Sequence, residues 1–184
     1  HYYARSNGFV TGDAFGIIER DDDAYIKYYS GDSKTVTIPS TFNGKPVSYI
    51  AEYAFDGCEN IKNVTFSDNL FQINSYAFCN CSSLKEITIP ATVTAIGIKA
   101  FYMSEITGVK VSEMNGTIGS YAFGKTTRIA NVTLKGGESG LTISSVAFAD
   151  TTATDVTVRG NVQINKKAFR NNASLKNINI SGNV

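Results

Sequence analysis

The chain has 184 residues, of which 42% are hydrophobic, and it carries 17 Lys and Arg against 16 Asp and Glu. This size and apolar content can form a substantial core, and a formal net charge of +1 without a basic run gives no reason to expect nucleic acid or an anionic membrane as a partner. His1 is the only histidine, which excludes a histidine-based catalytic triad and a two-histidine metal site.

The composition favours a secreted protein that is not inserted in a membrane. Charged residues make up 18% of the chain, below the roughly 25% of an average soluble domain, and neutral polar residues are plentiful. No apolar run approaches the roughly 20 residues that a membrane-spanning helix needs.

Residues 1–34 lack the repeated pattern that dominates the rest of the chain. Two apolar segments, residues 17–18 and 25–29, flank the acidic run 21–23, a pattern typical of two strands joined by a turn. Because the open end of a repeat array needs a cover, we expect an N-terminal β-hairpin cap at 1–34, followed by a repeat domain at 35–184. The acidic run lacks the spacing of a calcium loop, which favours a solvated turn over a metal site.

From residue 35 onward a unit of 21–25 residues recurs about six times. Each copy contains the sequence Ile-x-x-x-Ala-Phe, which ends at Phe55, Phe78, Phe101, Phe123, Phe148 and Phe169. A unit of this size cannot bury its own apolar face, but stacked copies can. We therefore expect a solenoid in which the six phenylalanines form a structural spine inside the core.

Each copy also contains alternating apolar pairs that predict strands. The first set of pairs is Val36/Ile38, Val64/Phe66, Ile87/Ile89, Val109/Val111, Val132/Leu134, Val156/Val158 and Ile178/Ile180. Period-two alternation is typical of a strand with one buried and one solvated face. A second apolar pair precedes most Ala-Phe dipeptides, as in Val47/Ile50, and indicates a second extended segment on the opposite wall.

Two segments carry a resemblance to a known family. Residues 50–58 (IAEYAFDGC) and 84–90 (LKEITIP) resemble the BspA-type leucine-rich repeats of bacterial surface proteins, and the resemblance extends over residues 35–184. It implies a β-rich, right-handed leucine-rich-repeat solenoid with a parallel sheet on its concave side and short strands on its convex side. From residue 103 the copies lose the cysteine and the strand-ending proline and gain Gly-rich stretches such as 136–140. We expect the chain to be a fragment of a longer protein.

The first candidate binding surface lies on the concave sheet, between the alternating apolar residues. The central water-facing positions are Thr37, Thr65, Thr88, Lys110, Thr133, Thr157 and Asn179. Of these, Thr65, Thr88, Lys110, Thr133 and Thr157 are the candidate binding residues. They form either a neutral hydrogen-bonding surface for a protein or glycan, or a row of threonines selected only because threonine favours strands. Lys110 interrupts the row, which disfavours ice binding.

The second candidate surface is an aromatic edge. Tyr53, Tyr76 and Tyr121 each lie two residues before a repeat phenylalanine, and Lys99 holds the same position between them. Tyrosine is common at interfaces because it offers a large contact area and a polar tip. The edge is either a contact strip for a partner or a set of rings packed over neighbouring coils.

The three cysteines do not form a disulfide framework. Cys58 and Cys81 share one repeat position, where we favour small buried side chains over a disulfide. Cys79 lies directly after its phenylalanine, and we expect it to be more accessible. The pair Cys79 and Cys81 is too closely spaced for a zinc site, so we expect no metal there.

The resemblance implies a surface protein that takes part in adhesion. We expect a non-catalytic, monomeric, extracellular or cell-surface module that binds a protein or glycan and needs no cofactor. The alternative is a spacer or scaffold domain of a larger secreted enzyme or surface protein. An enzyme that uses carboxylates such as Glu52, Asp56 or Glu86 is disfavoured, because no sequence feature pairs them in a pocket.

Overall fold

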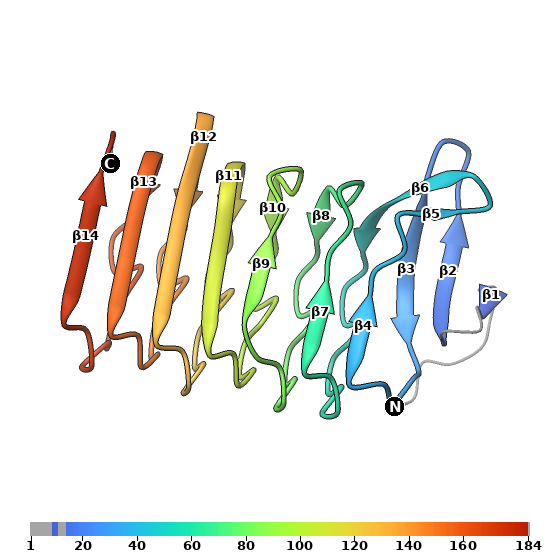
Figure 1. Cartoon of the computed structure of the whole chain (residues 1–184), viewed down its shortest axis with the longest axis horizontal. Coiled ribbons are helices and arrows are strands. Elements are labelled where there is room, and N and C mark those ends of the chain that lie inside the picture. The colour runs from blue at the N-terminus through green and yellow to red at the C-terminus, as the bar shows by residue number, and fades with distance from the viewer. Residues whose placement is uncertain (1–8, 11–13, 184) are drawn as a thin grey trace.

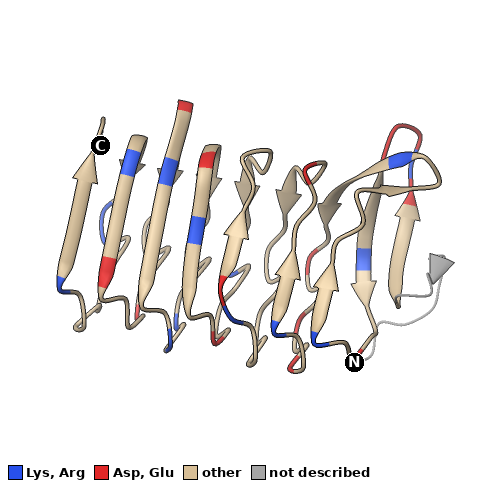
Figure 2. Ribbon diagram, viewed as in Figure 1, with Lys and Arg blue, Asp and Glu red and all other residues tan. Residues whose placement is uncertain are grey.

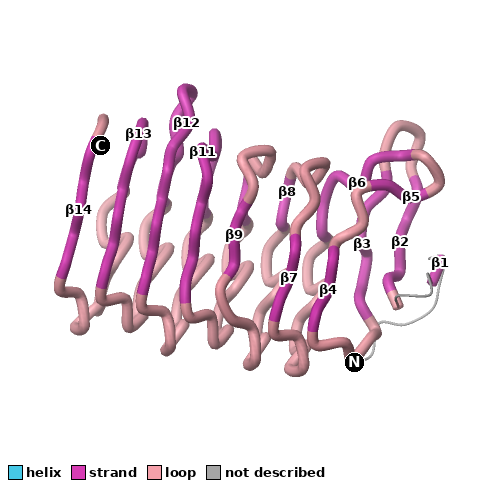
Figure 3. The backbone as a smooth tube through the Cα atoms, in the orientation of Figure 1, coloured by secondary structure: helices cyan, strands magenta, loops and turns pink. Residues whose placement is uncertain are grey.

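The chain forms a β-solenoid in which each repeat makes one coil of a winding rod, as Figure 1 shows for the computed structural model. The structure describes residues 9–10 and 14–183, and within them it contains strands and turns but no helix (Figure 3). The expected solenoid with parallel strands is confirmed. The strands are β1 (Phe9–Val10), β2 (Phe15–Glu19), β3 (Ala24–Tyr29), β4 (Thr35–Thr37), β5 (Thr41–Phe42), β6 (Lys45–Ile50), β7 (Asn63–Thr65), β8 (Gln72–Ile73), β9 (Ile87–Ile89), β10 (Ala95–Ile96), β11 (Gly108–Ile118), β12 (Asn131–Ile143), β13 (Asp155–Ile164) and β14 (Asn177–Ser181).

One wall of parallel strands, here called wall A, contains the strands with the alternating apolar pairs, and within it β4 and β7 pair as a separate two-stranded sheet. It consists of β4, β7, β9, β14 and the first halves of β11, β12 and β13, and it faces the viewer in Figure 1. Val132 of β12 is aligned with Val109 of β11 on one side and Val156 of β13 on the other. All three valines are buried, so the period-two pattern points its apolar side chains into the rod.

A second wall of parallel strands, wall B, lies behind wall A in Figure 1. It consists of β3, β6, β8, β10 and the second halves of β11, β12 and β13. The isoleucines of the repeat unit are direct neighbours in this sheet, in the order Ile26, Ile50, Ile73, Ile96, Ile118, Ile143 and Ile164. Their side chains meet the inner face of wall A and close the core.

In the later coils the two walls share continuous strands, which the sequence pattern did not predict. The strands β11, β12 and β13 have 11, 13 and 10 residues and bend from wall A into wall B through shifts in register. In the earlier coils Pro39 and Pro90 follow β4 and β9. Proline has no N–H to continue a ladder, so it ends the strand. The later coils lack proline and place glycines such as Gly136 at the bend.

The Ile-x-x-x-Ala-Phe segments form a third side of the rod, here called the turn side. The N–H of Phe55 donates a hydrogen bond to the carbonyl of Ala77 in the next coil (2.8 Å), and the N–H of Phe78 donates to that of Ala100 (2.7 Å). Left-handed backbone occurs at the positions two before and two after each phenylalanine, with φ between 53° and 69°: Tyr53, Gly57, Tyr76, Asn80, Lys99, Met103, Tyr121, Lys125, Val146, Asp150, Lys167 and Asn171. Each copy therefore bends sharply twice while its backbone stays paired with the next coil.

The repeat phenylalanines form a continuous column inside the rod. Neighbouring rings of Phe55, Phe78, Phe101, Phe123, Phe148 and Phe169 are stacked with centroids 4.5 to 5.2 Å apart and planes within 12° of parallel. The first five rings are fully buried, and Phe169 in the last coil is partly exposed. The alanine before each phenylalanine is also buried and leaves room for the ring.

The expected β-hairpin covers the first coil. The strands β2 and β3 pair in antiparallel orientation, and β3 then pairs in parallel with β6, so the hairpin also begins wall B. The ring of Tyr29 stacks on Phe55 at 5.1 Å and packs against Phe15 at 5.2 Å, which extends the aromatic column into the cap. The parts of the expected cap at residues 1–8 and 11–13 lie outside the described residues.

The opposite end of the described rod is open. Ile178 and Ile180 on β14 are 59% and 51% exposed, although the same positions are buried in the preceding coils. The reason is that no further coil packs over β14 within the part of the chain that the structure describes.

We predict that Phe101→Ala lowers the free energy of unfolding by about 3–5 kcal/mol, because it removes a fully buried ring that stacks on both sides. Phe169→Ala is the matched control at the same repeat position, with a stacking partner on one side among the described rings. It should cost clearly less. Equilibrium urea unfolding followed by circular dichroism measures both, and equal losses would contradict the column as the main source of stability.

We also predict that Gly136→Ala destabilises the bend between the walls by about 1–3 kcal/mol, because it overpacks a backbone contact. A Cβ at this position would lie 1.9 Å from the carbonyl oxygen of Asn161 in the next coil. Gly108→Ala serves as control, since its nearest neighbour would be the Glu86 side chain at 3.4 Å. Thermal unfolding should show a lower Tm for the first variant alone, and an unchanged Tm for both would argue against close coil contact there.

Candidate functional site

The aromatic edge lies along the turn side of the rod. Tyr53, Tyr76, Lys99 and Tyr121 all have left-handed backbone, and the turn-side ladder places them in successive coils. The left-handed conformation turns the chain sharply at this point, so the side chains project from the corner of each coil. Tyr53 is 52% exposed.

Aromatic rings and lysine ammonium groups contact one another along this edge. Tyr53 and Tyr76 are stacked with centroids 4.9 Å apart. Lys99 Nζ lies 5.5 Å from the Tyr76 ring centroid and 5.0 Å from that of Tyr102, within the range of cation–π attraction. Tyr102 meets Tyr121 edge to face at 6.1 Å. The tyrosines thus pack over neighbouring coils and also present an ordered outer surface.

Two members of the edge were missed by sequence reasoning. Tyr102 lies one residue after Phe101, and Lys125 lies two residues after Phe123, so neither shares the repeat position of the other tyrosines. Lys125 Nζ is 5.9 Å from the Tyr102 ring centroid. Tyr102 and Lys125 reach the edge because the coil bends at its two left-handed positions. The spacing of tyrosines in the sequence does not reveal these bends. From here on, "aromatic edge" means Tyr53, Tyr76, Lys99, Tyr102, Tyr121 and Lys125.

The threonine row lies on the outer face of wall A, the sheet expected on the concave side. Lys110 is aligned with Thr88 and Thr133, and Thr133 with Thr157, so these candidate residues are direct neighbours. Thr65 pairs with Thr37 in the first two coils. Thr65, Thr88 and Lys110 are exposed, whereas Thr133 and Thr157 are half-buried. The row offers hydroxyl groups on a flat surface.

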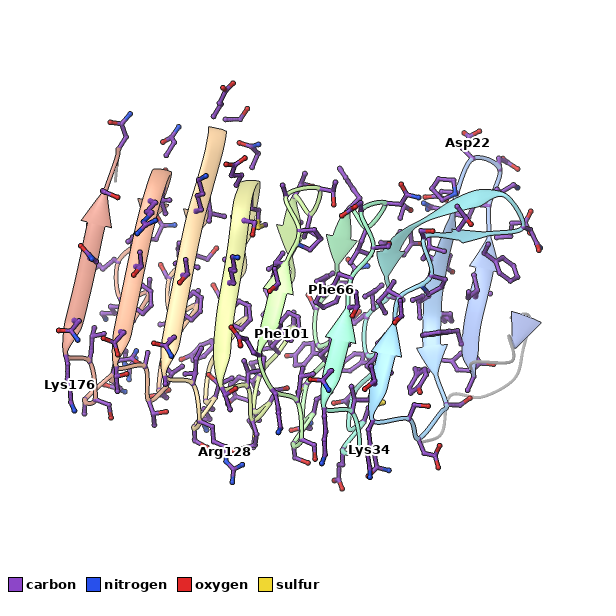
Figure 4. All side chains as sticks on the ribbon, viewed as in Figure 1. Asp22, Lys34, Phe66, Phe101, Arg128 and Lys176 are labelled. Atoms are coloured by element: carbon purple, nitrogen blue, oxygen red, sulfur yellow. The ribbon has the colours of Figure 1, made fainter. Side chains whose placement is uncertain are left out.

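Folding also gathers charges that are dispersed in the sequence. Figure 2 shows basic residues on the faces of β11, β12 and β13, where Lys135 forms an ion pair with Glu113. A second basic row precedes the strands of wall A, since the N–H of Lys62 donates to the carbonyl of Lys34 (2.7 Å) and the N–H of Lys85 to that of Lys62 (2.9 Å). Figure 4 shows Lys34 at the lower edge of the rod, where the strands of wall A begin. The sequence contains no basic run, so its linear pattern did not reveal this row.

The cysteines are free thiols and lie in the core or close to it. Cys81 is fully buried, and its thiol donates a hydrogen bond to the carbonyl of Phe55 (3.3 Å). Cys58 is half-buried at the same repeat position. The expectation that Cys79 is the most accessible of the three was wrong, because Cys79 is buried at 6% exposure whereas Cys58 is half-buried. At this position Gly124 and Ala149 are buried as well, whereas Asp56 and Arg170 are exposed, so burial there depends on the size and polarity of the side chain.

The repeat position of Cys58 and Cys81 has a shared structural role that the sequence pattern did not reveal. In later coils it holds Ser104, Thr126, Thr151 and Asn172. Ser104 Oγ donates to the carbonyl of Phe78 (2.5 Å), Thr126 Oγ1 to that of Phe123 (2.8 Å), and Asn172 Nδ2 to that of Phe148 (2.8 Å). These small polar groups satisfy buried carbonyls of the phenylalanine column, where an unpaired group would be costly.

Among the described residues, acidic side chains do not gather into a metal site. Asp22 lies at the tip of the turn between β2 and β3 (Figure 4), and Asp23 forms an ion pair with Arg20 instead. Within residues 14–183, no cluster of three or more histidine, cysteine or carboxylate side chains has the geometry to hold a metal ion. Asp56 accepts a hydrogen bond from Asn80 at 3.1 Å on the turn side.

Two surface depressions occur in the N-terminal half. One, of about 480 Å³, is lined by Arg20, Asp23, Ser48, Tyr49, Phe71, Gln72 and Asn74. The other, of about 350 Å³, lies at the end of β4 and β7 and is lined by residues 37–40 and 65–69. Neither is lined by Glu52, Asp56 or Glu86, the carboxylates considered for catalysis. The described chain also has no helix with the length and apolar character needed to cross a membrane.

Comparison with known proteins identifies the repeat. The family model described as the BspA type leucine rich repeat region matches residues 24–139 and 95–184 in six copies. No curated protein shows a significant match to the chain.

Solved structures share the fold. The chain is 25% identical to a leucine rich cell surface protein from Faecalibacterium prausnitzii, with a TM-score of 0.61 over 96% of this chain and 55% of that one. A leucine-rich repeat protein from Bacteroides ovatus gives 16% identity and a TM-score of 0.59 over 98% and 55% of the two chains. The T. pallidum leucine rich repeat protein gives 22% identity and a TM-score of 0.57 over 82% and 85%. The chain thus spans about half the length of the first two structures.

The thiols give a testable prediction. Burial raises the pKa of Cys58 to about 11, and nearby Asp56 adds to the shift; burial likewise raises the pKa of Cys79 to about 11. Thiols with raised pKa values are mostly protonated at neutral pH, and only the thiolate reacts. We therefore expect slow labelling by Ellman's reagent at pH 7.5, with a Cys58 rate that rises about tenfold per pH unit below its pKa.

All three cysteines should react once the unreduced protein is unfolded in guanidinium chloride. Cys58→Ala is the control, and it should abolish the fastest native-state phase because Cys58 is the most exposed of the three. A single reactive thiol in the unfolded, unreduced wild type would instead indicate a disulfide between Cys58 and Cys81.

Proposed function

Because the chain belongs to the BspA-type leucine-rich repeat family, we propose that it is a non-catalytic binding module that acts outside the cell or on the cell surface. In this role it adheres to a protein or glycan of a host or of another cell through the outer surface of the rod. The F. prausnitzii structure that it resembles is named as a cell surface protein, which supports this location.

The observation that carries the proposal is the aromatic edge. Stacked or edge-to-face tyrosines and two lysines form an ordered strip across four successive coils. Such rings give a large contact area at low cost in conformational entropy, because neighbouring side chains already hold them in place. The exposed side chains of Ile98 and Met103 belong to the same two bends and add apolar contact area.

A spacer or scaffold role within a larger secreted enzyme or surface protein is the second candidate. The observation that favours it is length, since the chain spans about half of the F. prausnitzii and B. ovatus structures. A rod with three hydrogen-bonded sides suits this role mechanically. In that case the exposed tyrosines only stabilise the turn side.

Binding to a panel of purified extracellular-matrix proteins and to intact epithelial cells distinguishes the two roles. We predict retention of the wild type at micromolar concentration and a loss of about tenfold or more in affinity for the double variant Tyr53→Ala/Tyr76→Ala, as expected for contact aromatics. Ile180→Ala removes a similarly exposed apolar side chain away from the edge and from the depressions, and it should leave retention of matrix protein unchanged. Surface plasmon resonance measures all three proteins. Failure of the wild type to bind any surface in the panel would favour the spacer role.

A further inference from the structure

The depression of about 480 Å³ lies where the repeat pattern is broken. It forms where the turn between β2 and β3 meets the outer face of β6 and β8. We call it the hairpin pocket and define it by Arg20, Asp23, Ser48, Tyr49, Phe71, Gln72 and Asn74. Its volume falls within the roughly 300–1,000 Å³ of small-molecule sites.

One side of the hairpin pocket is a fixed aromatic and guanidinium layer. Tyr49 is the neighbour of Tyr25 in wall B, and the two rings are stacked at 4.4 Å with planes 10° apart. The Arg20 guanidinium carbon lies 4.9 Å from the Tyr49 ring centroid. Asp23 accepts two hydrogen bonds from Arg20, both of 2.6 Å, and a further one from Ser48. Each planar group is therefore held in position before any ligand arrives.

The other side combines an exposed ring with a pair of amides. Phe71 lies directly before β8 and is 56% exposed, although it is a large apolar residue. Gln72 follows it, stands beside Tyr49 in wall B, and donates from Nε2 to Asn74 Oδ1 at 2.6 Å. This bond leaves the Gln72 carbonyl oxygen as an acceptor and the Asn74 amide nitrogen as a donor. Acceptors and donors thus lie next to flat apolar surface.

The charges in the hairpin pocket cancel. Arg20 and Asp23 form a two-bond ion pair, and Arg20 keeps the pKa of Asp23 below its ordinary value, so the carboxylate stays ionised at neutral pH. An anionic ligand would have to compete with Asp23 for the guanidinium, and a cationic ligand with Arg20 for the carboxylate. A neutral ligand that offers many hydroxyl groups and one flat C–H face meets neither obstacle.

From these contacts we propose that the hairpin pocket binds a neutral saccharide, one face of whose pyranose ring packs on Phe71 while its hydroxyls bond to Gln72, Asn74 and Arg20. This inference rests on the proposed binding role, and it names the ligand class of a surface separate from the aromatic edge.

The chain itself supplies a matched control for the amide pair. Gln163 lies in the same outward row of wall B, near the other end of the rod, and donates from Nε2 to Asn165 Oδ1 at 3.2 Å. It repeats the Gln72 and Asn74 arrangement without the stacked tyrosines, the ion pair or an exposed phenylalanine beside it. If Gln72→Ala weakens binding and Gln163→Ala does not, the binding is assigned to the hairpin pocket rather than to such amide pairs in general.

The test uses saturation-transfer-difference NMR with the methyl glycosides of glucose, galactose, mannose and N-acetylglucosamine, with methyl glucuronide as the anionic probe. We expect saturation of ring C–H protons in at least one neutral glycoside. Gln72→Ala should weaken that binding up to about tenfold, the size expected for a lost hydrogen bond. Phe71→Ala, which alters an exposed side chain, should reduce saturation, and Gln163→Ala should leave it unchanged.

Three outcomes would overturn the pocket. They are no saturation of any neutral glycoside, equal effects of Gln72→Ala and Gln163→Ala, and preferential binding of methyl glucuronide. The double variant Tyr53→Ala/Tyr76→Ala separates this proposal from the proposed function, since it should keep saccharide binding while losing retention on matrix protein. Retention on matrix protein without any saccharide binding would leave the proposed function in place and refute the pocket alone.

Discussion

The distance between successive coils is the constraint on which the rest of the structure depends. Backbone hydrogen bonds along both walls and the turn side hold neighbouring strands at the roughly 4.8 Å of a β-sheet. Aromatic rings also stack favourably at about this separation. The phenylalanine column, the Tyr53–Tyr76 pair and the Tyr29–Phe55 contact all have centroid distances between 4.5 and 5.2 Å. One spacing therefore serves the core and the surface together.

The same spacing places each side chain beside the residue at the same position of the next coil. At buried positions this alignment favours side chains that pack well against a copy of themselves in the next coil, such as phenylalanine and isoleucine. It also requires that each buried polar group find a partner, which explains the position three after the phenylalanine. Cys81, Ser104 and Asn172 differ chemically, yet each donates to a phenylalanine carbonyl of the preceding coil. Ser104 and Asn172 thus replace the cysteine but keep its hydrogen bond, whereas Thr126 donates to Phe123 of its own coil and Thr151 to Asn172.

The regular repeat and the N-terminal hairpin that interrupts it produce two different kinds of surface. Along the middle of the rod, repetition yields rows, such as the threonine row on wall A and the aromatic edge on the turn side. Such rows suit extended contact with a large partner. At the N-terminal end the hairpin turn adds Arg20 and Asp23 to the outward row of wall B. There aromatic, charged and amide side chains converge, as recognition of a small ligand requires.

The sequence by itself determined the family, the solenoid, the parallel walls and the hairpin of β2 and β3, because the spacing of apolar residues decides which side chains leave water. The tertiary structure decided the rest. It bent the chain twice at left-handed positions, which brought Tyr102 and Lys125 to the aromatic edge, and it left Cys79 buried. It also joined Arg20 to Tyr49 and Gln72 across separate strands. These contacts depend on the direction in which side chains point at each bend and on which coils are neighbours. The spacing of residues in the sequence gives neither.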